Sequence, residues 1–284
     1  MFTKLLKHEW KANAGLLGIL SLCALGAGVL GIFVIRGMLY IIDLATELDN
    51  IGMALLGSTG MAGILFFIVI GLVAYALAVQ FINLFRFYKS RFTDEGYLTF
   101  TLPVNSHQIF LSSFLNIVAW MVISFLVVLV SAALMFVAGF WEGIVEVIEA
   151  YKQYSDVVDM IVDEAFGMMH GYDFYTLSSI ILSVVGSLYT IVMMMTSLTI
   201  GSVLVKKLKL LASVGIYYGI NMAVGVLESV LMMIPTVIIS ASYTEDYYYY
   251  LGGVMLVSAV IYLGLAVGGY FLSTTLMKKK LNLP

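Results

Sequence analysis

Six long runs of apolar residues constrain this 284-residue chain more than any other feature of its sequence. A helix needs about 20 mostly apolar residues to cross ~30 Å of hydrocarbon, because it rises about 1.5 Å per residue. The runs that reach this length lie near residues 14–36, 60–84, 108–139, 176–204, 211–239 and 251–276. The sequence therefore predicts an all-α, polytopic membrane protein with six transmembrane helices, forming a single transmembrane domain over residues 1–284.

The composition supports the same class of protein. Hydrophobic residues make up 62% of the chain and charged residues 11%, with a mean hydropathy of +1.05. A water-soluble domain carries about 25% charged residues, so a soluble globular fold is excluded. The first run has no Ala-x-Ala site after it, which predicts a retained span and not a cleaved signal peptide. The lone Cys23 forbids an intrachain disulfide.

Positive charge is segregated between alternate connections, and this pattern predicts the orientation. Cytoplasmic loops retain Lys and Arg. Of the 14 cations, twelve fall on one side if there are six spans, namely Lys4, Lys7, Lys11, Arg86, Lys89, Arg91, Lys206, Lys207, Lys209, Lys278, Lys279 and Lys280. Only Arg36 and Lys152 fall on the other side, so we expect both termini to be cytoplasmic.

The N-terminal segment, residues 1–12, has the pattern of an amphipathic helix. Phe2, Leu5, Leu6 and Trp10 share one helical face, and the basic residues lie mostly on the other. This pattern is typical of an interfacial elbow helix lying flat on an anionic membrane surface. A basic N-terminus that only sets topology would explain the same residues.

Residues 41–55 and 142–169 are predicted to be extracellular amphipathic helices and not spans. Apolar residues recur there at helical spacing, and carboxylates fill the opposite face. The carboxylates are explained by a solvated face on connecting helices. A funnel that attracts a cationic substrate is the alternative.

The chain lacks the common motifs of catalytic and metal sites. It contains no Gly-x-x-x-x-Gly-Lys-Ser/Thr, no His-Glu-x-x-His and no Gly-x-Ser-x-Gly, and its three histidines are scattered. We therefore expect no enzymatic activity, no metal and no cofactor on this chain, and no nucleic acid among its partners.

One carboxylate, Glu228, lies within a predicted span. A charge at that depth is costly, so Glu228 should face the bundle interior or a water-filled cavity, or be protonated. At 100° per residue, Tyr217 lies about 20° from Glu228 and Asn221 about 40° from Tyr217, so the three share a stripe on the fifth span. The stripe either lines a translocation path or subunit seam, or it is an internal hydrogen-bonded cluster with a hydroxyl of a neighbouring helix.

The loop after the second span is rich in aromatic residues for a segment outside the membrane. It reads Asp94-Glu-Gly-Tyr-Leu-Thr-Phe-Thr-Leu-Pro-Val104 and is followed by a capping-box pattern at residues 105–108. From composition alone, these aromatics indicate either contact with a partner or anchoring at the membrane interface.

Together with the opening Phe2-Thr-Lys-Leu-Leu-Lys-His-Glu-Trp-Lys11 and the ending Lys278-Lys-Lys-Leu-Asn-Leu-Pro284, this loop resembles the permease subunits of type-2 ABC exporters of Gram-positive bacteria. The resemblance implies a cytoplasmic coupling helix in the first intracellular loop, which contacts a separately encoded ATPase subunit that carries ATP and Mg. The contact residues would be Asp94, Glu95, Gly96, Tyr97, Leu98 and Phe100. Two permeases, identical or homologous, would pair around a path lined by the second and fifth spans.

The expected function is therefore transport across a bacterial plasma membrane by alternating access, with the ATPase subunit supplying the energy. The substrate class stays open between a peptide, such as a cationic antimicrobial peptide, a lipid and a drug-like compound. The alternatives are an ion-coupled secondary carrier using Glu228 and a non-transporting membrane scaffold or immunity protein.

Overall fold

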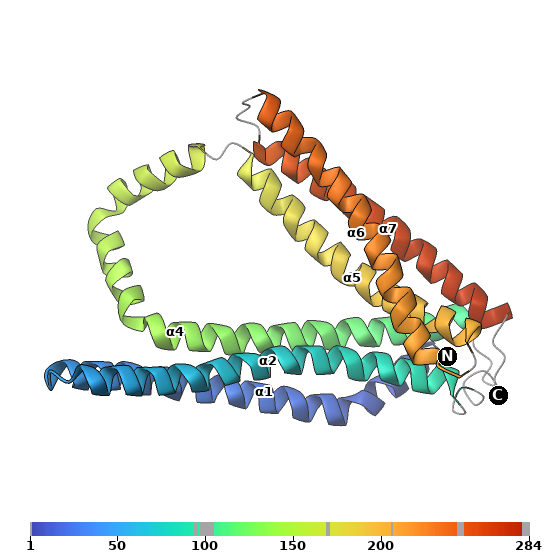
Figure 1. The fold of residues 1–284 in the computed structure, drawn as a ribbon, viewed down its shortest axis with the longest axis horizontal. Helices are drawn as coiled ribbons and strands as arrows, with labels where there is room; N and C mark the ends of the chain where they lie inside the picture. Colours follow the sequence, from blue (N-terminus) through green and yellow to red (C-terminus); the bar gives the residue numbers. More distant parts are fainter. Residues whose placement is uncertain are drawn as a thin grey trace. The chain divides into compact units, whose positions relative to one another are not determined.

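The computed structural model describes residues 2–93, 96, 105–168, 171–205, 207–242 and 247–279. Side chains are described at these positions except 150, 156, 158, 161–168, 234–236, 238–242 and 279. All regular secondary structure in these ranges is helical. The helices are α1 (Phe2–Glu47), α2 (Ile51–Phe92), α4 (Ser106–Met168), α5 (Tyr172–Leu204), α6 (Lys209–Ser242) and α7 (Tyr247–Lys279) (Figure 1).

Each of these six helices contains a stretch long and apolar enough to cross a membrane. In α4 this stretch is Ser106–Glu149. The prediction of an all-helical, multi-pass membrane protein with six spans is thus confirmed for the described part of the chain. At about 1.5 Å per residue, the 46 residues of α1 extend ~69 Å, more than twice the ~30 Å of a hydrocarbon layer.

The helices are longer than the predicted spans because they absorb the flanking amphipathic segments. α1 includes both residues 2–12 and residues 41–47, and α4 continues past residue 142 with a non-helical residue at Tyr154 (φ −126°, ψ 28°). Neither helix contains a proline, so no backbone hydrogen bond is lost at the predicted boundaries. The structure therefore has no break between the elbow segment and the first span. That the first turns lie in the membrane interface stays a prediction.

Contacts divide the chain into two compact units. The α1–α2–α4 unit comprises residues 3–85 and 115–155. The α5–α6–α7 unit comprises residues 1–2, 86–114 and 156–284, and so includes the end of α2 and the start of α4. Both described flanks of the loop that is predicted to be a coupling helix therefore belong to the α5–α6–α7 unit.

In the α1–α2–α4 unit, α1 buries one continuous stripe of mostly small or polar residues. The stripe consists of Glu9, Asn13, Leu17, Ser21, Ala24, Gly28 and Gly31. Two hydrogen bonds join it to α2: Asn13 Nδ2 donates to Asn83 Oδ1 at 2.7 Å, and the hydroxyls of Ser21 and Tyr75 lie 2.7 Å apart. A Cβ added at Gly28 would lie 2.6 Å from Ser131 Cβ, so glycine allows α1 and α4 to approach closely.

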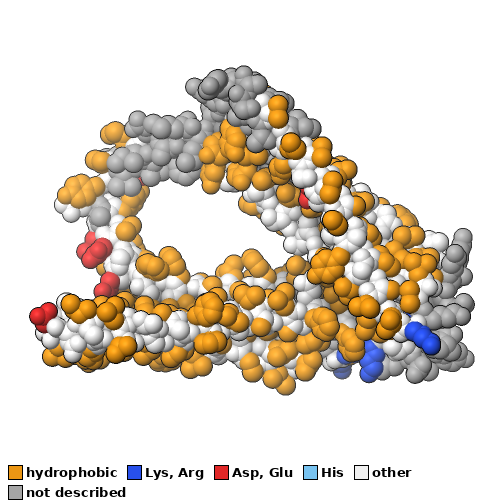
Figure 2. Space-filling model, viewed as in Figure 1, with side chains coloured by type: hydrophobic (Ala, Val, Ile, Leu, Met, Phe, Trp, Pro, Cys, Tyr) orange, Lys and Arg blue, Asp and Glu red, His pale blue; other side chains and the backbone are white. Residues whose placement is uncertain are grey.

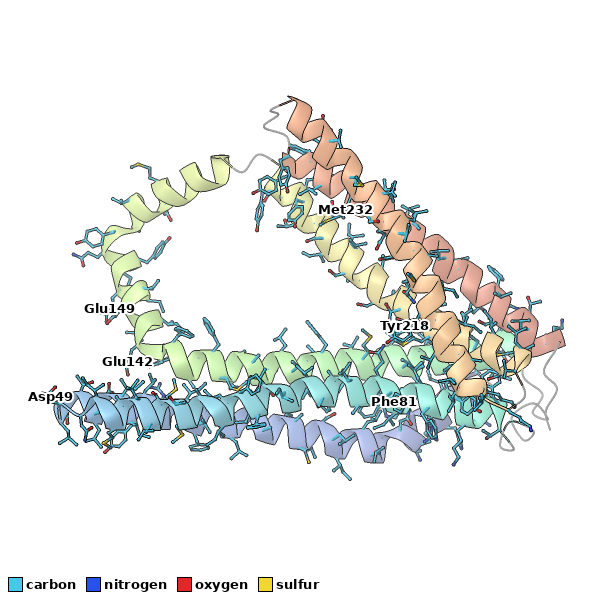
Figure 3. The ribbon with its side chains drawn as sticks, in the orientation of Figure 1. Asp49, Phe81, Glu142, Glu149, Tyr218 and Met232 are labelled. Atoms are coloured by element: carbon cyan, nitrogen blue, oxygen red, sulfur yellow. The ribbon has the colours of Figure 1, made fainter. Side chains whose placement is uncertain are left out.

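Acidic residues lie at the end of this unit where α1 turns into α2. Asp49 lies in the turn with φ 50°, and Glu142 and Glu149 follow each other along α4 (Figure 3). Glu142 Oε1 lies 3.8 Å from Arg36 Nη1, an exposed ion pair that contributes little to stability. Figure 2 shows hydrophobic side chains along the three helices and acidic side chains near this end.

In the α5–α6–α7 unit, α5 packs most extensively against α7 and then against α6. Its C-terminal half is the buried half, from Tyr189 onward. Ser273 Oγ on α7 donates to Thr196 Oγ1 on α5 at 3.0 Å. A Cβ added at Gly201 would lie 2.8 Å from the backbone nitrogen of Ser213, so α5 and α6 are in backbone contact there.

Candidate functional site

The first candidate site is centred on Glu228, in the middle of α6. In the described parts of α5, α6 and α7, the other charged residues lie in the first or last turn of their helices: Asp173, Lys209, Lys278 and Lys279. Glu228 is half-buried. It is therefore an isolated intramembrane carboxylate, and such residues mark functional sites by default.

One tyrosine of a neighbouring helix contacts this carboxylate, and a second tyrosine stacks on the first. Tyr262 of α7 forms a side-chain hydrogen bond with Glu228. Its ring stacks on Tyr189 of α5, with centroids 4.6 Å apart and planes 8° from parallel. Glu228 thus makes the contact that an internal hydrogen-bonded cluster requires.

Tyr189 is the most deeply buried member of the cluster, with 3% of its surface exposed. Its hydroxyl has no hydrogen-bond partner among the described residues, although it lies within electrostatic range of Tyr217 and Glu228. A buried hydroxyl without a partner is unusual, because losing hydrogen bonds to water is costly. The hydroxyl of Tyr189 is therefore a buried hydrogen-bonding group that has no partner in the described part of the chain.

The predicted stripe on α6 is present, but its members differ in what they do. Tyr217 and Asn221 are half-buried, whereas their neighbours Tyr218 and Met222 are 68% and 75% exposed (Tyr218 is labelled in Figure 3). Tyr217 and Glu228 both lie within electrostatic range of Tyr189. The Asn221 amide instead donates to the Tyr217 carbonyl of its own helix at 2.8 Å. The role of the stripe in a path or a subunit seam stays a prediction.

Sequence reasoning missed Tyr189 and Tyr262, which the tertiary structure adds to the cluster. Each tyrosine lies inside an apolar run, where a phenol needs a polar neighbour. That signal was available from the sequence. The choice of Glu228 as the neighbour was not, because it depends on how α5, α6 and α7 pack.

The second candidate site is the loop between α2 and α4. Of the six predicted coupling residues, the structure describes Gly96, whose backbone N–H donates to the Thr93 carbonyl at 2.8 Å. The other five, Asp94, Glu95, Tyr97, Leu98 and Phe100, lie outside the described residues. Their contact with an ATPase stays a prediction.

Both flanks of this loop are anchored to neighbouring helices. Arg91 is 2% exposed, and its Nη2 donates to Ser113 Oγ of α4 at 2.9 Å. Lys209 Nζ of α6 donates to the carbonyl of Phe92 at 3.3 Å.

The flank that opens α4 is joined to α7. His107 Nδ1 lies 2.9 Å from the Tyr270 hydroxyl, and the ring of Phe110 packs edge-on against Tyr270 at 5.4 Å. A displacement of the loop would therefore reach α4, α6 and α7.

The residues of the predicted elbow lie in the first turns of α1. Phe2, Leu5 and Leu6 are half-buried, and Trp10 stacks on Trp120 of α4 with centroids 5.0 Å apart. Trp10 therefore packs against another helix of the protein, and lipid does not surround its whole ring.

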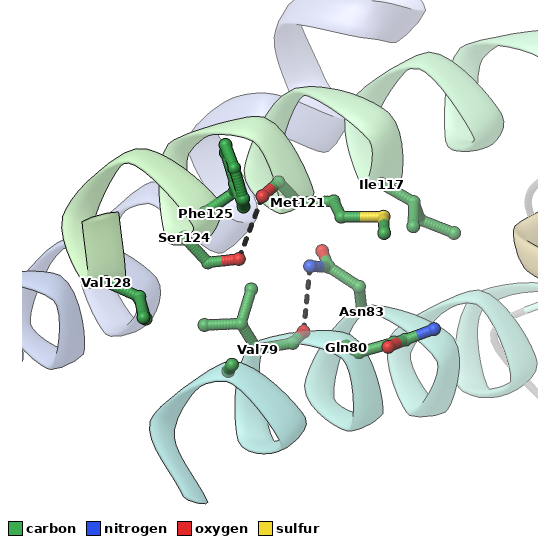
Figure 4. Close-up of a pocket in the computed structure, with 9 residues that line it drawn as sticks. Val79, Gln80, Asn83, Ile117, Met121, Ser124, Phe125 and Val128 are labelled. Carbon is green, nitrogen blue, oxygen red and sulfur yellow. Dashed lines mark hydrogen bonds between the residues drawn. The ribbon is translucent and has the colours of Figure 1, made fainter. Parts of the chain in front are cut away.

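A pocket of about 210 Å³ lies between α2 and α4 in the α1–α2–α4 unit (Figure 4). Its lining is mostly apolar, with Gln80, Asn83 and Ser124 as polar members. Asn83 Nδ2 donates to Val79 O at 2.9 Å, and Ser124 Oγ donates to Met121 O at 2.9 Å. These bonds direct polar atoms to the helices' own backbones and not into the pocket.

Within the described ranges, no group of three or more His, Cys, Asp or Glu side chains could hold a metal ion. Comparisons with known protein families, with curated proteins and with solved structures find no match. The assignment of function therefore depends on the residues themselves.

Proposed function

We propose that this chain is the permease subunit of a type-2 ABC exporter in a bacterial plasma membrane, with both termini in the cytoplasm. It would move a substrate outward by alternating access. A separately encoded ATPase subunit would bind and hydrolyse ATP with Mg, and a second permease, identical or homologous, would complete the path. This chain would carry no catalytic residue.

The loop between α2 and α4 carries the proposal. Its sequence from Asp94 to Val104 resembles a coupling helix, and its flanks are fixed by one buried and one partly buried hydrogen bond. A loop that transmits force needs both properties, a partner-specific surface and stiff attachment to the helices that move. An anchor at the membrane interface would need neither the Arg91–Ser113 hydrogen bond nor the Lys209–Phe92 hydrogen bond.

In the proposed mechanism, closure of the ATPase subunits displaces the coupling loop. The displacement passes through Arg91 to the start of α4, through Lys209 to α6 and through the His107–Tyr270 contact to α7. Because α5 packs against both α6 and α7, these three helices would move together and change the side on which the path is open.

An ion-coupled carrier is the less supported function. Such carriers place discontinuous helices at their ion sites. Here α5, α6 and α7 are uninterrupted α-helices wherever their residues are described, including around Glu228. A scaffold or immunity protein would need no coupling loop.

Affinity purification of the tagged chain from its native membrane in mild detergent tests the proposal. We expect a stoichiometric ATPase subunit to copurify. Replacing Asp94 and Glu95 with Ala should release it, because the proposed contact loses both its charges. The matched control replaces Asp43 and Glu47, two exposed carboxylates near the far end of α1, and should retain it.

Two outcomes would contradict the proposal. The first is a chain that purifies alone under several mild conditions. The second is a variant lacking both loop carboxylates that still copurifies with an ATPase and supports coupled ATP hydrolysis.

A further inference from the structure

We propose that Glu228, Tyr262 and Tyr189 form a binding site for the ammonium or guanidinium group of an organic cation. The assignment of this site as the substrate site of an exporter rests on the proposed function. The substrates would then be amphiphilic cations. Binding of the cation to the chain does not depend on an ATPase.

The first argument is the missing counter-charge of Glu228. Lys209 begins α6, and Lys278 and Lys279 end α7, so the described helices packed around Glu228 offer no cation near the middle of α6. A carboxylate in a span normally pairs with a cationic group or faces water. The Tyr262 hydroxyl satisfies one hydrogen bond and supplies no positive charge. A bound cation would supply the charge.

The second argument is the aromatic surroundings of the carboxylate. Tyr189 and Tyr262 stack in nearly parallel planes, and Tyr217 lies within electrostatic range of Tyr189. Tyrosine rings attract cations placed over their faces within about 6 Å of the centroid, and clustered rings are how proteins recognise alkylated ammonium groups. A carboxylate that is hydrogen-bonded to one tyrosine of a stacked pair therefore suits an organic cation better than a small, strongly hydrated metal ion.

The third argument is the hydroxyl of Tyr189. It is buried, it has no hydrogen-bond partner among the described residues, and it lies within electrostatic range of Glu228. A ligand with several N–H groups could donate one to this hydroxyl and another to the carboxylate. The cluster thus offers an acceptor besides the carboxylate.

The site can be reached from one side of α6. Glu228 is half-buried, and its neighbours Leu227 and Val230 are 48% and 57% exposed. The approach is apolar, so the ligand that fits has a cationic head and an apolar body.

Binding is tested on the full chain in lipid nanodiscs, with any subunit that copurifies and without ATP. The probe is the fluorescent alkylammonium dansylcadaverine, displaced by dodecylguanidinium. Glu228→Gln should weaken binding about 30-fold or more, as when one partner of a buried charge pair is lost. Tyr189→Phe should weaken it about threefold, because it removes a hydrogen bond and keeps the ring.

Two controls separate binding from folding. Asp173→Asn removes an exposed carboxylate in the first turn of α5 and should leave dansylcadaverine affinity unchanged. Glu228→Asp retains the charge and should bind more tightly than Glu228→Gln. Equal affinity of these two variants would overturn the inference.

The competitors identify the ligand chemistry. Displacement by dodecylguanidinium but not by the neutral 1-dodecanol supports the inference. Equal displacement by 1-dodecanol shows an apolar site, and displacement by K⁺ or Na⁺ at similar concentration shows an inorganic cation site; either would overturn it. If an ATPase copurifies and Glu228→Gln still binds normally, this inference fails and the exporter proposal stands.

Discussion

The hydrogen bond between Asn13 and Asn83 offers a sharp test of how α1 packs. Asn13 Nδ2 donates to Asn83 Oδ1 at 2.7 Å, and Asn83 Nδ2 donates to the Val79 carbonyl of α2 at 2.9 Å. Both side chains are buried. Asn13→Ala removes the donor and leaves a buried amide oxygen unsatisfied, which costs about 1–3 kcal/mol of unfolding free energy.

The pairwise contribution is isolated by a double-mutant cycle. Asn13→Ala, Asn83→Ala and the double variant are unfolded with SDS from mixed micelles, and the free energies of unfolding are compared. Interhelical hydrogen bonds in membrane proteins average about 0.6 kcal/mol by this method and reach about 1.7 kcal/mol. We expect a coupling energy in the upper part of this range, because the hydrogen bond is short and both of its side chains are buried.

The control pairs Asn13→Ala with Thr46→Ala. The Thr46 hydroxyl donates to the Ile42 carbonyl of its own helix at 2.8 Å, and the two sites are 33 residues, ~50 Å, apart on α1. Their effects should add to within about 0.5 kcal/mol. A coupling of zero between Asn13 and Asn83 would refute the register of α1 against α2. A zero coupling would also favour an arrangement in which the first turns of α1 separate from the other helices as an elbow helix.

Two further predictions concern helix contacts in the α5–α6–α7 unit. Gly201→Leu should destabilise the protein by about 1–3 kcal/mol, because the added side chain meets the backbone of α6. Gly215→Leu should be tolerated, because nothing lies within 4 Å of a Cβ added there. The free energies of unfolding in SDS compare the two variants. Ser113→Ala should cost about 1.5–3 kcal/mol by breaking a hydrogen bond to the buried guanidinium of Arg91. Ser112→Ala, which loses only a bond to a carbonyl of its own helix, should cost less, and equal losses would contradict the anchoring of the loop.

The anchored loop and the carboxylate cluster belong to the same unit of the structure. Arg91 and Lys209 connect the loop to the beginnings of α4 and α6, and Glu228 lies further along α6. A rigid α-helix transmits an axial displacement along its length. The proposed cation site therefore lies on an element that the proposed coupling movement would shift.

The sequence by itself determined the class of protein, the six spans and the isolation of Glu228. These follow from local properties, because a run of about 20 apolar residues must leave water whatever its neighbours are. The sequence also placed Tyr217, Asn221 and Glu228 on one face of α6, since helical periodicity alone sets that relation. It overestimated the number of helix boundaries, because amphipathic flanks with no proline continue the helices that they adjoin.

Only the tertiary structure decided which side chains meet between helices. The pairing of Glu228 with Tyr262, the stacking of Tyr189 and the contact of Asn13 with Asn83 join residues 34 to 73 positions apart in the sequence. In hydrocarbon, apolar faces do not distinguish one neighbour from another, so helix pairing depends on close packing of small residues and on a few polar contacts. A hydropathy profile predicts neither of these. The contacts of the Glu228 cluster therefore depend on how α5, α6 and α7 pack together.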